Sequence, residues 1–424
     1  MRFNHGKREY TLTDGKSEFQ FFTDEYVAQG GCVRIEGEMA AGGIRAGKIE
    51  TLSGAGEKEV LERTKESVIS SCGFPDSPIL LPEAGPIWPI LKKAAGEIIF
   101  ARKAGRSVLI RFHGDADGIV SAFALGEVLK CKAFQQNSAV YSVKEALRDL
   151  AFIGQESRPL IILADFGSGS REGLEILRAA GVDYLVIDHH PYEDKENGAI
   201  INPLKIDKDN SKYCAGYLCC EISAMCGMDR EEARAWARVA CAGDKSEILR
   251  STQADAEKAM VLDFLASHIS YGNNLDFYRK VMGQEELFKS IAAQAEQSIE
   301  EAAQKAMARM KRGGTKTEVV SFALEGIAQR GEWPPSSKIT TRVFDKLKGE
   351  NALICIGYTE RSIIMRLNDA AVSAGLGANL LAEKMKASMG DFIEGGGGHA
   401  KAGAIRVKEG FVKEVLGQLL AELS

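Results

Sequence analysis

The sequence lacks any apolar run long enough to cross a membrane, because a spanning helix needs about 18 or more consecutive apolar residues. Its first ten residues, MRFNHGKREY, also lack the apolar stretch of a secretion signal. It contains neither a long internal repeat nor a low-complexity tail. We therefore expect a cytoplasmic protein with no membrane partner.

The sequence also lacks an excess of positive charge. Its 54 Lys and Arg residues are outnumbered by 59 Asp and Glu residues, which gives a formal net charge of −5. Proteins that bind nucleic acid through their overall charge carry the opposite sign. Any polyanion would have to meet a local groove of basic residues or metal ions, and this weakens a pure binding function more than an enzymatic one.

Paired cysteine motifs are missing as well. The chain has nine cysteines, an odd number, and none forms a C-x-x-C pair. Four of them cluster in the helical-looking segment YCAGYLCCEISAMC, at positions 214, 219, 220 and 226. One interpretation is a metal or redox site. The favoured interpretation is reduced thiols that pack as small apolar side chains, which suits a reducing cytoplasm.

The composition is that of a globular protein, with 45% hydrophobic and 27% charged residues, and the length allows two or three domains. Short alternating apolar runs with glycine turns predict a β-rich module over residues 1–56, with an OB-like barrel as one interpretation. Residues 57–104 carry five prolines and are expected to form a helical linker region.

Residues 105–250 show an α/β pattern. Three short, continuously apolar runs, SVLIRF, PLIILADF and DYLVIDHH, are separated by helical stretches such as those over 118–129 and 171–180. Continuous apolar runs that alternate with helices predict a parallel sheet covered on both faces.

A helical connector is expected over residues 251–314, with its last helix ending at the glycine pair 313–314. The runs TEVVSFAL, NALICIGY and RSIIMRL, followed by an amphipathic helix near 378–388, predict a second, smaller α/β domain over 315–424.

Acidic and histidine residues follow all three apolar runs of the 105–250 region. They are His113, Asp115 and Asp117 after the first run, Asp165 after the second, and Asp188, His189 and His190 after the third. The carboxyl ends of parallel strands form the crevice where ligands bind. Gathering these groups there would be electrostatically costly without a cation. The donors suit Mn²⁺, Mg²⁺ or Fe²⁺, with Zn²⁺ as a further choice.

Taken singly, these residues have simpler interpretations. Asp115 and Asp117 could be turn or N-cap residues, and Asp165 could end a strand in a turn. Asp244, which follows the helical segment AWARVACA, reads alone as a post-helix turn residue. Their occurrence at three consecutive strand ends argues against a purely structural role.

The order of these motifs resembles the DHH phosphoesterase superfamily, in its branch of RecJ-like exonucleases and nanoRNases. The segment GGGGHAKAG at 395–403 is similar to the signature of the DHH-associated C-terminal domain. The resemblance covers about residues 105–424. It implies a parallel-sheet catalytic domain joined by a helical connector to a smaller α/β substrate-binding domain.

The resemblance also implies roles for the strand-end residues. His113, Asp115 and Asp165 would hold one metal ion; Asp117, Asp165, His189 and Asp244 would hold a second, with Asp165 bridging. Many RecJ proteins carry Asp where this chain has His113, and GDKSE around Asp244 departs from the family's frequent Asp-Thr pair. The two ions are expected to be Mn²⁺, with Mg²⁺ as the alternative. His190 would contact the scissile phosphate, and Asp188 would orient a histidine.

In the C-terminal domain the resemblance implies that substrate is bound by Arg366, Gly396, Gly397, Gly398 and His399. A run of glycines lets backbone N–H groups approach a phosphate or base closely. The competing interpretations are a surface cation for Arg366 and a surface loop with an unrelated histidine for the glycine run.

Three functions remain open. The first is a RecJ-like exonuclease that degrades single-stranded DNA, RNA or short oligonucleotides to mononucleotides. The second is a small-molecule phosphodiesterase or pyrophosphatase, acting for example on a cyclic dinucleotide. The third is a replication-associated scaffold with residual nuclease activity. A replication or repair protein would then be a further partner, and the sequence leaves DNA or RNA preference, polarity and oligomeric state open.

Overall fold

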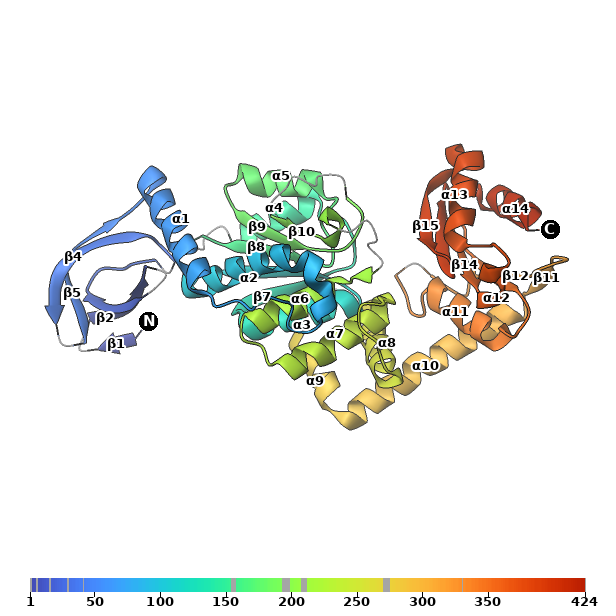
Figure 1. Cartoon of the computed structure of the whole chain (residues 1–424), viewed down its shortest axis with the longest axis horizontal. Helices are drawn as coiled ribbons and strands as arrows, with labels where there is room; N and C mark the ends of the chain where they lie inside the picture. Colours follow the sequence, from blue (N-terminus) through green and yellow to red (C-terminus); the bar gives the residue numbers. More distant parts are fainter. Residues whose placement is uncertain are drawn as a thin grey trace. The chain divides into compact units, whose positions relative to one another are not determined.

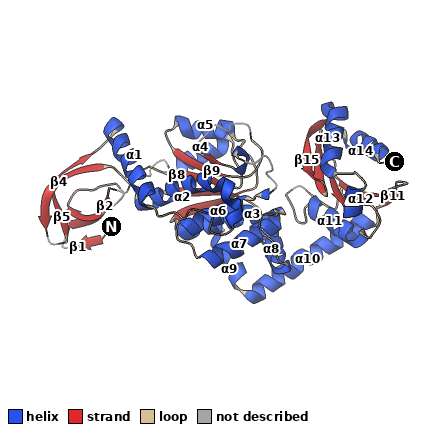
Figure 2. Cartoon of the chain, in the orientation of Figure 1, coloured by secondary structure: helices blue, strands red, loops and turns tan. Residues whose placement is uncertain are grey.

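The computed structural model describes residues 2–4, 7–14, 17–28, 30–40, 42–153, 158–192, 199–206, 212–269, 275–329 and 331–423. The chain divides into two compact units, Met1–Lys280 and Val281–Ser424. Figure 1 follows the chain through both units, and Figure 2 colours its helices and strands.

A five-stranded sheet opens unit 1 and confirms the β-rich N-terminal module (Figure 2). In spatial order its strands are β1 (Arg2–Asn4), β2 (Lys7–Thr13), β3 (Glu18–Thr23), β5 (Gly43–Thr51) and β4 (Val33–Ala40). β3 and β5 are parallel, and the other neighbours are antiparallel. Five strands suit an OB-like barrel. The pairings of the described residues leave β1 and β4 at the two edges, so closure of a barrel stays a prediction.

Two long helices and a proline-rich segment follow the module. They are α1 (Gly54–Ser71), the 3₁₀-helix η1 (Pro82–Ile87) and α2 (Trp88–Lys103). A buried carboxylate, Glu221, accepts hydrogen bonds from the backbone N–H groups of Ile79 and Leu80. The indole of Trp88 donates to the carbonyl of Pro75 at 3.1 Å. The contacts with Glu221 attach the proline-rich segment to the neighbouring α/β domain, and the Trp88 contact holds the segment against the start of α2.

The second sheet of unit 1 is parallel throughout. In spatial order its strands are β10 (Ile200–Ile201), β9 (Asp183–Ile187), β8 (Leu160–Ala164), β6 (Val108–His113) and β7 (Cys131–Gln136). The three apolar runs form β6, β8 and β9, which confirms the predicted parallel sheet. The sequence does not predict β7 or β10, because CKAFQQ carries a lysine and two amides and β10 has only two residues.

Helices cover both faces of this sheet (Figure 1). They are α3 (Ala116–Val128), α4 (Val143–Ile153), α5 (Arg171–Ala179), α6 (Ala215–Met225), α7 (Arg230–Asp244), α8 (Gln253–His268) and α9 (Leu275–Gly283). On one face Leu109, Ile161 and Leu163 pack against Leu174 and Leu177 of α5. On the other face α3 lies against β6 and is enclosed by α6 and α7, so nearly all of its side chains are buried.

Unit 2 contains a mixed six-stranded sheet. In spatial order its strands are β11 (Lys311–Gly313), β12 (Glu318–Ala323), β13 (Leu353–Tyr358), β14 (Ser362–Leu367), β16 (Ala402–Val407) and β15 (Ile393–His399). Its helices are α10 (Glu285–Met307), α11 (Ser336–Leu347), α12 (Asp369–Ser373), α13 (Ala378–Met389), η4 (Gly390–Phe392) and α14 (Val412–Glu422). The three predicted strand runs are β12, β13 and β14, and the predicted amphipathic helix is α13.

One expectation about the connector is wrong. Helix α10 ends at Met307 rather than at the glycine pair, and residues 311–313 form strand β11. Gly314 has a φ of 86°, a left-handed conformation that glycine adopts without strain, and it turns β11 back along β12. The glycines therefore shape a hairpin instead of stopping a helix.

The four clustered cysteines are buried in and beside α6, the placement expected for thiols that pack as small apolar side chains. Within the described part of the chain, no helix is both long enough and apolar enough to span a membrane.

Candidate metal centre

The first cluster lies where β6 passes into α3. Asp115 is the N-cap of α3: one carboxylate oxygen accepts a hydrogen bond from the backbone N–H of Gly118 at 3.0 Å. Its other oxygen lies 2.6 Å from Nδ1 of His113. Gly118 permits this tight passage, because a Cβ at that position would lie 2.2 Å from the carbonyl oxygen of His113. Asp115 is therefore both a helix cap and a partner of the neighbouring imidazole.

Asp165 lies at the centre of the candidate site, directly after β8. Its oxygens are 3.5 Å from Nδ1 of His113 and 3.5 Å from Nε2 of His189. Its backbone has a φ of 67°, which is uncommon for a residue other than glycine and typical of strained functional sites. Its side chain is only 2% exposed. One carboxylate thus faces the histidines from two different strand ends.

A loop built around Asp188 follows β9. One oxygen of Asp188 accepts from the backbone N–H groups of His189 and His190 and lies 2.8 Å from Nδ1 of His190. The other oxygen accepts from the backbone N–H of Ser168 at 2.9 Å. Burial raises the pKa of Asp188, but His190 and Ser168 lower it by more, so the net pKa is lowered. Asp188 therefore remains ionised and fixes the orientation of the His190 ring.

Asp117 lies in the first turn of α3 and is held by a second helix. Both of its oxygens accept backbone hydrogen bonds at the start of α6, from Ala215 and Gly216 at 2.8 Å each. One of these oxygens also lies 3.9 Å from Nε2 of His189. The side chain is thus close to the site, but α6 fixes its position.

The carboxylates of the predicted second ligand set do not all face the same ring nitrogen of His189. Asp117 and Asp165 face Nε2, whereas Asp244 lies 3.8 Å from Nδ1, on the other side of the ring. Asp244 ends α7, and Lys245 follows it in a left-handed conformation with a φ of 59°. In this arrangement Asp244 belongs to the acidic surroundings of His189, on the far side from Asp165.

Among the residues that the structure describes, two groups of ligand atoms are close enough together to hold a metal ion. They are His113, Asp115 and Asp165, and Asp165, His189 and His190, with all ligand atoms of each group within 4.8 Å of one another. Asp165 belongs to both groups. The first group matches the predicted first ion. The second contains His190 in place of Asp117 and Asp244.

The donor atoms themselves are suited to bind a cation. Oδ1 of Asp165 and Nδ1 of His189 are buried without a hydrogen-bond partner among the described residues. Buried polar atoms are nearly always hydrogen-bonded, so each of these two atoms, one on either side of the His189 ring, is available to bind a ligand. Mixed carboxylate and imidazole donors suit Mn²⁺, Mg²⁺ or Fe²⁺. The residues present therefore fit a divalent metal centre.

The electrostatics of the metal-free cluster agree with this. Burial lowers the pKa of His113 and His189, but the surrounding carboxylates raise both by more, so each net pKa lies well above the ordinary value. Burial raises the pKa of Asp244 to about 6. In contrast, the two histidines hold the pKa of Asp165 well below its usual range. The cluster therefore favours positive charge between its carboxylates, and a divalent ion would supply such charge.

The C-terminal residues predicted to bind substrate lie in unit 2. Arg366 on β14 and His399 on β15 both pair with Ala402 of the strand between them, so their side chains share one face of the sheet. Arg366 is mostly buried and donates to Oγ1 of Thr341 at 2.9 Å. Burial lowers its pKa from the ordinary value.

The glycine run forms most of strand β15. It lies at an edge of the unit 2 sheet and pairs only with β16 among the described strands. A Cβ added at Gly397 would meet no atom within 4 Å, whereas one at Gly398 would lie 2.3 Å from the carbonyl oxygen of Ala402. The interpretation as a surface loop is therefore wrong. The unpaired edge of β15 presents backbone polar groups that a ligand could reach.

Comparison with known proteins identifies a family domain in the part of the chain that contains the site. Residues 107–243 match the DHH family, N-terminal domain. This match spans β6 to α7 and so contains the whole candidate site except Asp244. This segment of the chain therefore carries a DHH-family domain.

Solved DHH structures share the fold. A structure described as the DHH domain of a member of the s1p family of ribosomal proteins superposes with a TM-score of 0.70 at 21% identity; it covers 87% of this chain and 99% of its own length. RecJ of Thermus thermophilus, solved with Mn²⁺, superposes with a TM-score of 0.53 at 15% identity, over 82% of this chain and 56% of RecJ.

An uncharacterized protein of Methanocaldococcus jannaschii is 22% identical over 451 aligned positions, which cover 88% of this chain. The present chain spans 59% of the length of that relative.

The DHH domain also uses residues that the sequence does not single out. Asn202 is fully buried; its amide donates to the carbonyl of His190 at 2.9 Å and to Oγ of Ser168 at 3.1 Å. Asp263 of α8 accepts from the backbone N–H of Ala116 at 2.8 Å, between the two aspartates of the first motif. In the sequence, the pair Asn202-Pro203 predicts only a turn, and Asp263 is one polar residue of a predicted helix. Neither pattern predicts a contact with the site, so these hydrogen bonds are seen only in the structure.

Proposed function

We propose that this DHH-superfamily chain is a two-metal phosphodiesterase that degrades single-stranded nucleic acid from one end, in the manner of RecJ. The observation that carries the proposal is the position of Asp165. It is buried, strained and shared by two groups of ligand atoms, and one of its oxygens has no hydrogen-bond partner within the described ranges. Such a carboxylate suits a bridge between two ions.

Two divalent ions at this edge would place positive charge beside a phosphate and lower the pKa of the attacking water. The chain's own residues then fix the geometry. Asp115 and Asp188 hold His113 and His190, and both aspartates are anchored by backbone N–H groups. The ligand atoms therefore need little rearrangement when substrate binds, which favours stabilisation of the transition state.

His190 is suited to contact the phosphate. Its side chain is 44% exposed, and Asp188 holds its Nδ1, so Nε2 is the ring nitrogen left for a substrate. Burial lowers the pKa of His190, but Asp188 raises it by more. The ring therefore keeps its second proton to a higher pH than a free histidine. A protonated Nε2 can donate to a non-bridging phosphate oxygen as negative charge develops there.

Unit 2 supports a nucleic-acid substrate. Arg366 and His399 lie on one sheet face, and the glycine strand β15 leaves backbone groups accessible beside them. A guanidinium, an imidazole and accessible backbone groups suit the repeated phosphates of a strand better than a single small anion. We infer that this unit binds nucleotides other than the one being cleaved.

The test is a panel of substrates with Mn²⁺ and with Mg²⁺. End-labelled single-stranded DNA and RNA of several lengths, a cyclic dinucleotide and pyrophosphate are compared, with Asp165→Asn as the inactive control. We expect mononucleotide products from the single strands and faster turnover of strands than of small molecules. Preferential cleavage of the cyclic dinucleotide or pyrophosphate, independent of chain length, would replace the nuclease proposal with a small-molecule one. Inactivity on every substrate would favour a scaffold.

A further inference from the structure

Five exposed cationic side chains gather at the β11 edge of the unit 2 sheet, beside the end of α10 (Figure 1). They are Lys305 of α10, Arg309, Lys311 and Arg312 of β11, and Lys316 just before β12. Residues 302–317 contain no Asp or Glu, although the whole chain carries a net charge of −5. We call these five side chains the basic edge. It is a local concentration of positive charge in an acidic protein.

Most charges of the basic edge have no acidic partner. The side chains that form no ion pair or hydrogen bond within the described part of the chain are those of Lys305, Lys311 and Lys316. Arg312 pairs with Glu318. Arg309 donates only to a backbone carbonyl, at 2.6 Å, which leaves its charge without a carboxylate. These charges are therefore open to an external anion.

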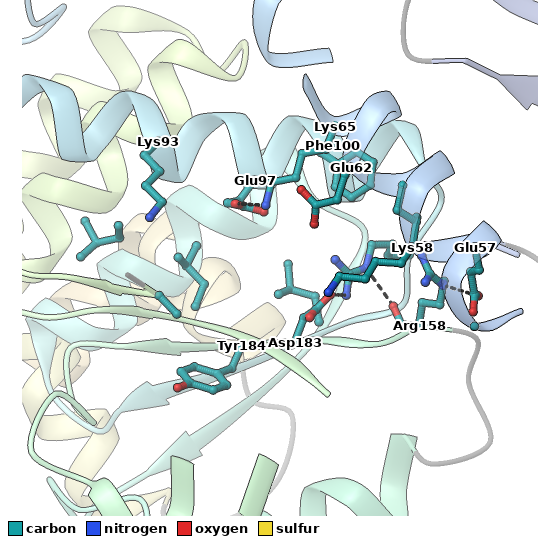
Figure 3. Close-up of a pocket in the computed structure, with 17 residues that line it drawn as sticks. Glu57, Lys58, Glu62, Lys65, Lys93, Glu97, Phe100, Arg158, Asp183 and Tyr184 are labelled. Carbon is teal, nitrogen blue, oxygen red and sulfur yellow. Dashed lines mark hydrogen bonds and ion pairs between the residues drawn. The ribbon is translucent and has the colours of Figure 1, made fainter. Parts of the chain in front are cut away.

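The cations around the cavity between α1, α2 and the parallel sheet of unit 1 behave differently (Figure 3). There Lys65 of α1 meets Glu97 of α2 at 2.5 Å, and Arg158 meets Glu57 at 3.0 Å. These ion pairs join α1 to its neighbours, so the positive charges serve the fold. The unpaired lysines of the basic edge have no such structural partner among the described residues.

The strand pairings place the basic edge in line with the residues proposed to bind substrate. One transverse row of directly paired residues crosses all six strands of the sheet: Arg312, Val320, Cys355, Arg366, Ala402 and His399. Directly paired residues share a face of the sheet, so Arg312 lies on the same face as Arg366 and His399. Neighbouring strands lie about 4.8 Å apart, so about 24 Å separates the two edges.

The chemistry of the basic edge favours the phosphates of a nucleic acid. No large apolar side chain is exposed between residues 302 and 317, all of which the structure describes. A protein interface has an apolar core, and a helix on a membrane surface has an apolar face. A phosphate backbone, in contrast, binds lysine and arginine through charge alone. Charge without apolar anchors is what such a backbone requires.

We propose that the basic edge binds the phosphate backbone of the same single nucleic-acid strand that Arg366 and His399 contact. This inference rests on the proposed function for the identity of the strand, and it adds a second contact surface. Phosphates follow one another by about 3.4 Å along one strand of B-DNA, so 24 Å corresponds to about seven nucleotides. A trinucleotide could therefore reach only one edge of the sheet, whereas a 20-mer could reach both.

The first test measures binding to the full chain in EDTA, so that no strand is cleaved. Fluorescent single-stranded 20-mers of DNA and RNA are titrated by anisotropy at several salt concentrations. The double variant Lys311→Gln with Lys316→Gln should bind about tenfold more weakly at low salt. Each phosphate contact of a single strand contributes about 0.7 to the slope of log K against log salt concentration. The slope should therefore become shallower by about 1.4.

Lys408→Gln with Lys413→Gln is the matched control. Both lysines are exposed, and their side chains form no ion pair or hydrogen bond among the residues that the structure describes. Strand β16 begins at Ala402, beside His399, and Lys408 follows its far end. The control removes the same charge from the same unit, and its affinity and salt slope should stay unchanged. Circular dichroism checks that both double variants fold.

The second test uses Mn²⁺ and separates this inference from the proposed function. Cleavage of a trinucleotide and of a 20-mer is compared for the unaltered chain and both double variants. Loss of Lys311 and Lys316 should lower kcat/KM about tenfold on the 20-mer and leave the trinucleotide unaffected, because only the long strand reaches both edges. If the unaltered chain cleaves neither substrate, the proposed function fails, and binding in EDTA still decides whether the basic edge holds a strand.

Four results would overturn the inference. The first is the absence of saturable 20-mer binding by the EDTA-treated chain. The second is no difference between the two double variants, which would indicate only a general charge effect. The third is an equal loss on the trinucleotide and the 20-mer, which would place these lysines beside the cleaved nucleotide. The fourth is binding that requires Lys311 and Lys316 for phosphatidylserine vesicles or polyglutamate but not for nucleic acid, which would assign the surface to a membrane or an acidic protein.

Discussion

Oδ1 of Asp188 lies 2.8 Å from Nδ1 of His190 and also accepts the backbone N–H groups of both histidines in the loop. A single carboxylate oxygen thus shapes the backbone and orients the ring. The same ring lies close enough to Asp165 and His189 to count among potential metal ligands. His190 is therefore either a contact to the phosphate or a ligand to the metal, and these two roles predict different mutant behaviour.

We expect His190→Ala to keep its metal ions and to lose about 100- to 1,000-fold in kcat, the usual effect of removing a donor that acts in the transition state. Metal content by elemental analysis is measured beside the rate. Asp188→Asn should also lower kcat, because the ring loses its charged partner. If metal content fell in proportion to activity in His190→Ala, His190 would be a ligand instead.

Asp165→Ala is expected to abolish hydrolysis and to lower metal content below that of any other single ligand variant. The reason is that Asp165 belongs to both groups of ligand atoms, whereas His113 belongs to one. His113→Ala is therefore the comparison, and it should retain more metal. Asp229→Asn, an exposed N-cap far from the site in sequence, serves as the unaffected control. Two ions per chain and a normal rate in Asp165→Ala would refute a bridging role.

The sequence predicts the sheet of the DHH domain better than its binding site. β6, β8 and β9 are recognisable because a strand buried on both faces is continuously apolar. This apolar pattern does not identify β7, because two of its buried residues are glutamines. The Gln135 amide donates to the carbonyl of Ala266, and the Gln136 amide donates to the carbonyl of Val140. A buried amide needs a specific partner, and no pattern in the strand itself reveals one.

Strand ends can be predicted, but the orientation of each donor cannot. The sequence places Asp117, Asp165 and Asp244 near one another, yet only the fold shows that Asp117 is held by the start of α6. It also shows Asp244 on the far side of His189. The left-handed conformation of Asp165 is equally invisible in sequence, because residues other than glycine seldom adopt it.

Metal-free protein should become less stable as the pH rises, and metal should stabilise it increasingly. His113 and His189 have pKa values raised well above 6.5. A histidine whose pKa is raised in the folded state stabilises the fold fully at a pH below its pKa in the unfolded state. This stabilisation is lost as the pH rises through the pKa of the folded state. The raised pKa of Asp244, about 6, acts in the same direction. A divalent ion replaces the lost protons.

The measurement is Tm in EDTA and in Mg²⁺ between about pH 6 and pH 9, a range that brackets the histidine titration. We expect the difference between the two Tm values to grow with pH. The double variant His113→Gln with His189→Gln should lose most of this pH dependence. A metal effect that stays constant across the range would contradict the assignment of these histidines to the ion site.

Asn202→Ala should destabilise the chain by about 1–3 kcal/mol, because it removes buried hydrogen bonds. It should also lower kcat, since Asn202 holds the carbonyl of His190 and the hydroxyl of Ser168, whose backbone N–H bonds Asp188. Urea unfolding and rate are measured together.

Asn202→Asp keeps the acceptor for the N–H of Leu204 but cannot donate, so it separates the two effects. Asn351→Ala, at an exposed position, is the control, and a normal rate in Asn202→Ala would remove Asn202 from the site.

Arg366 and His399 of unit 2 are expected to affect substrate binding but not metal content. Both pair with Ala402 on one face of the unit 2 sheet, and neither belongs to a group of potential metal ligands among the described residues. Arg366→Ala and His399→Ala should therefore leave metal content unchanged. A charge-assisted hydrogen bond contributes about 1.5–3 kcal/mol, so each variant should lose roughly ten- to a hundredfold in kcat/KM on oligonucleotides.

A small aryl phosphodiester such as bis-p-nitrophenyl phosphate distinguishes where these residues act. It has no neighbouring nucleotides, so its hydrolysis should be nearly unaffected in both variants if unit 2 binds the rest of a strand. Arg361→Ala is the matched control: it removes a half-exposed arginine that pairs with Glu394 at 2.7 Å and precedes the same strand β14. An equal loss on both substrates would place Arg366 or His399 at the scissile phosphate. No loss on either would make the glycine strand structural and remove the main support for a nucleic-acid substrate.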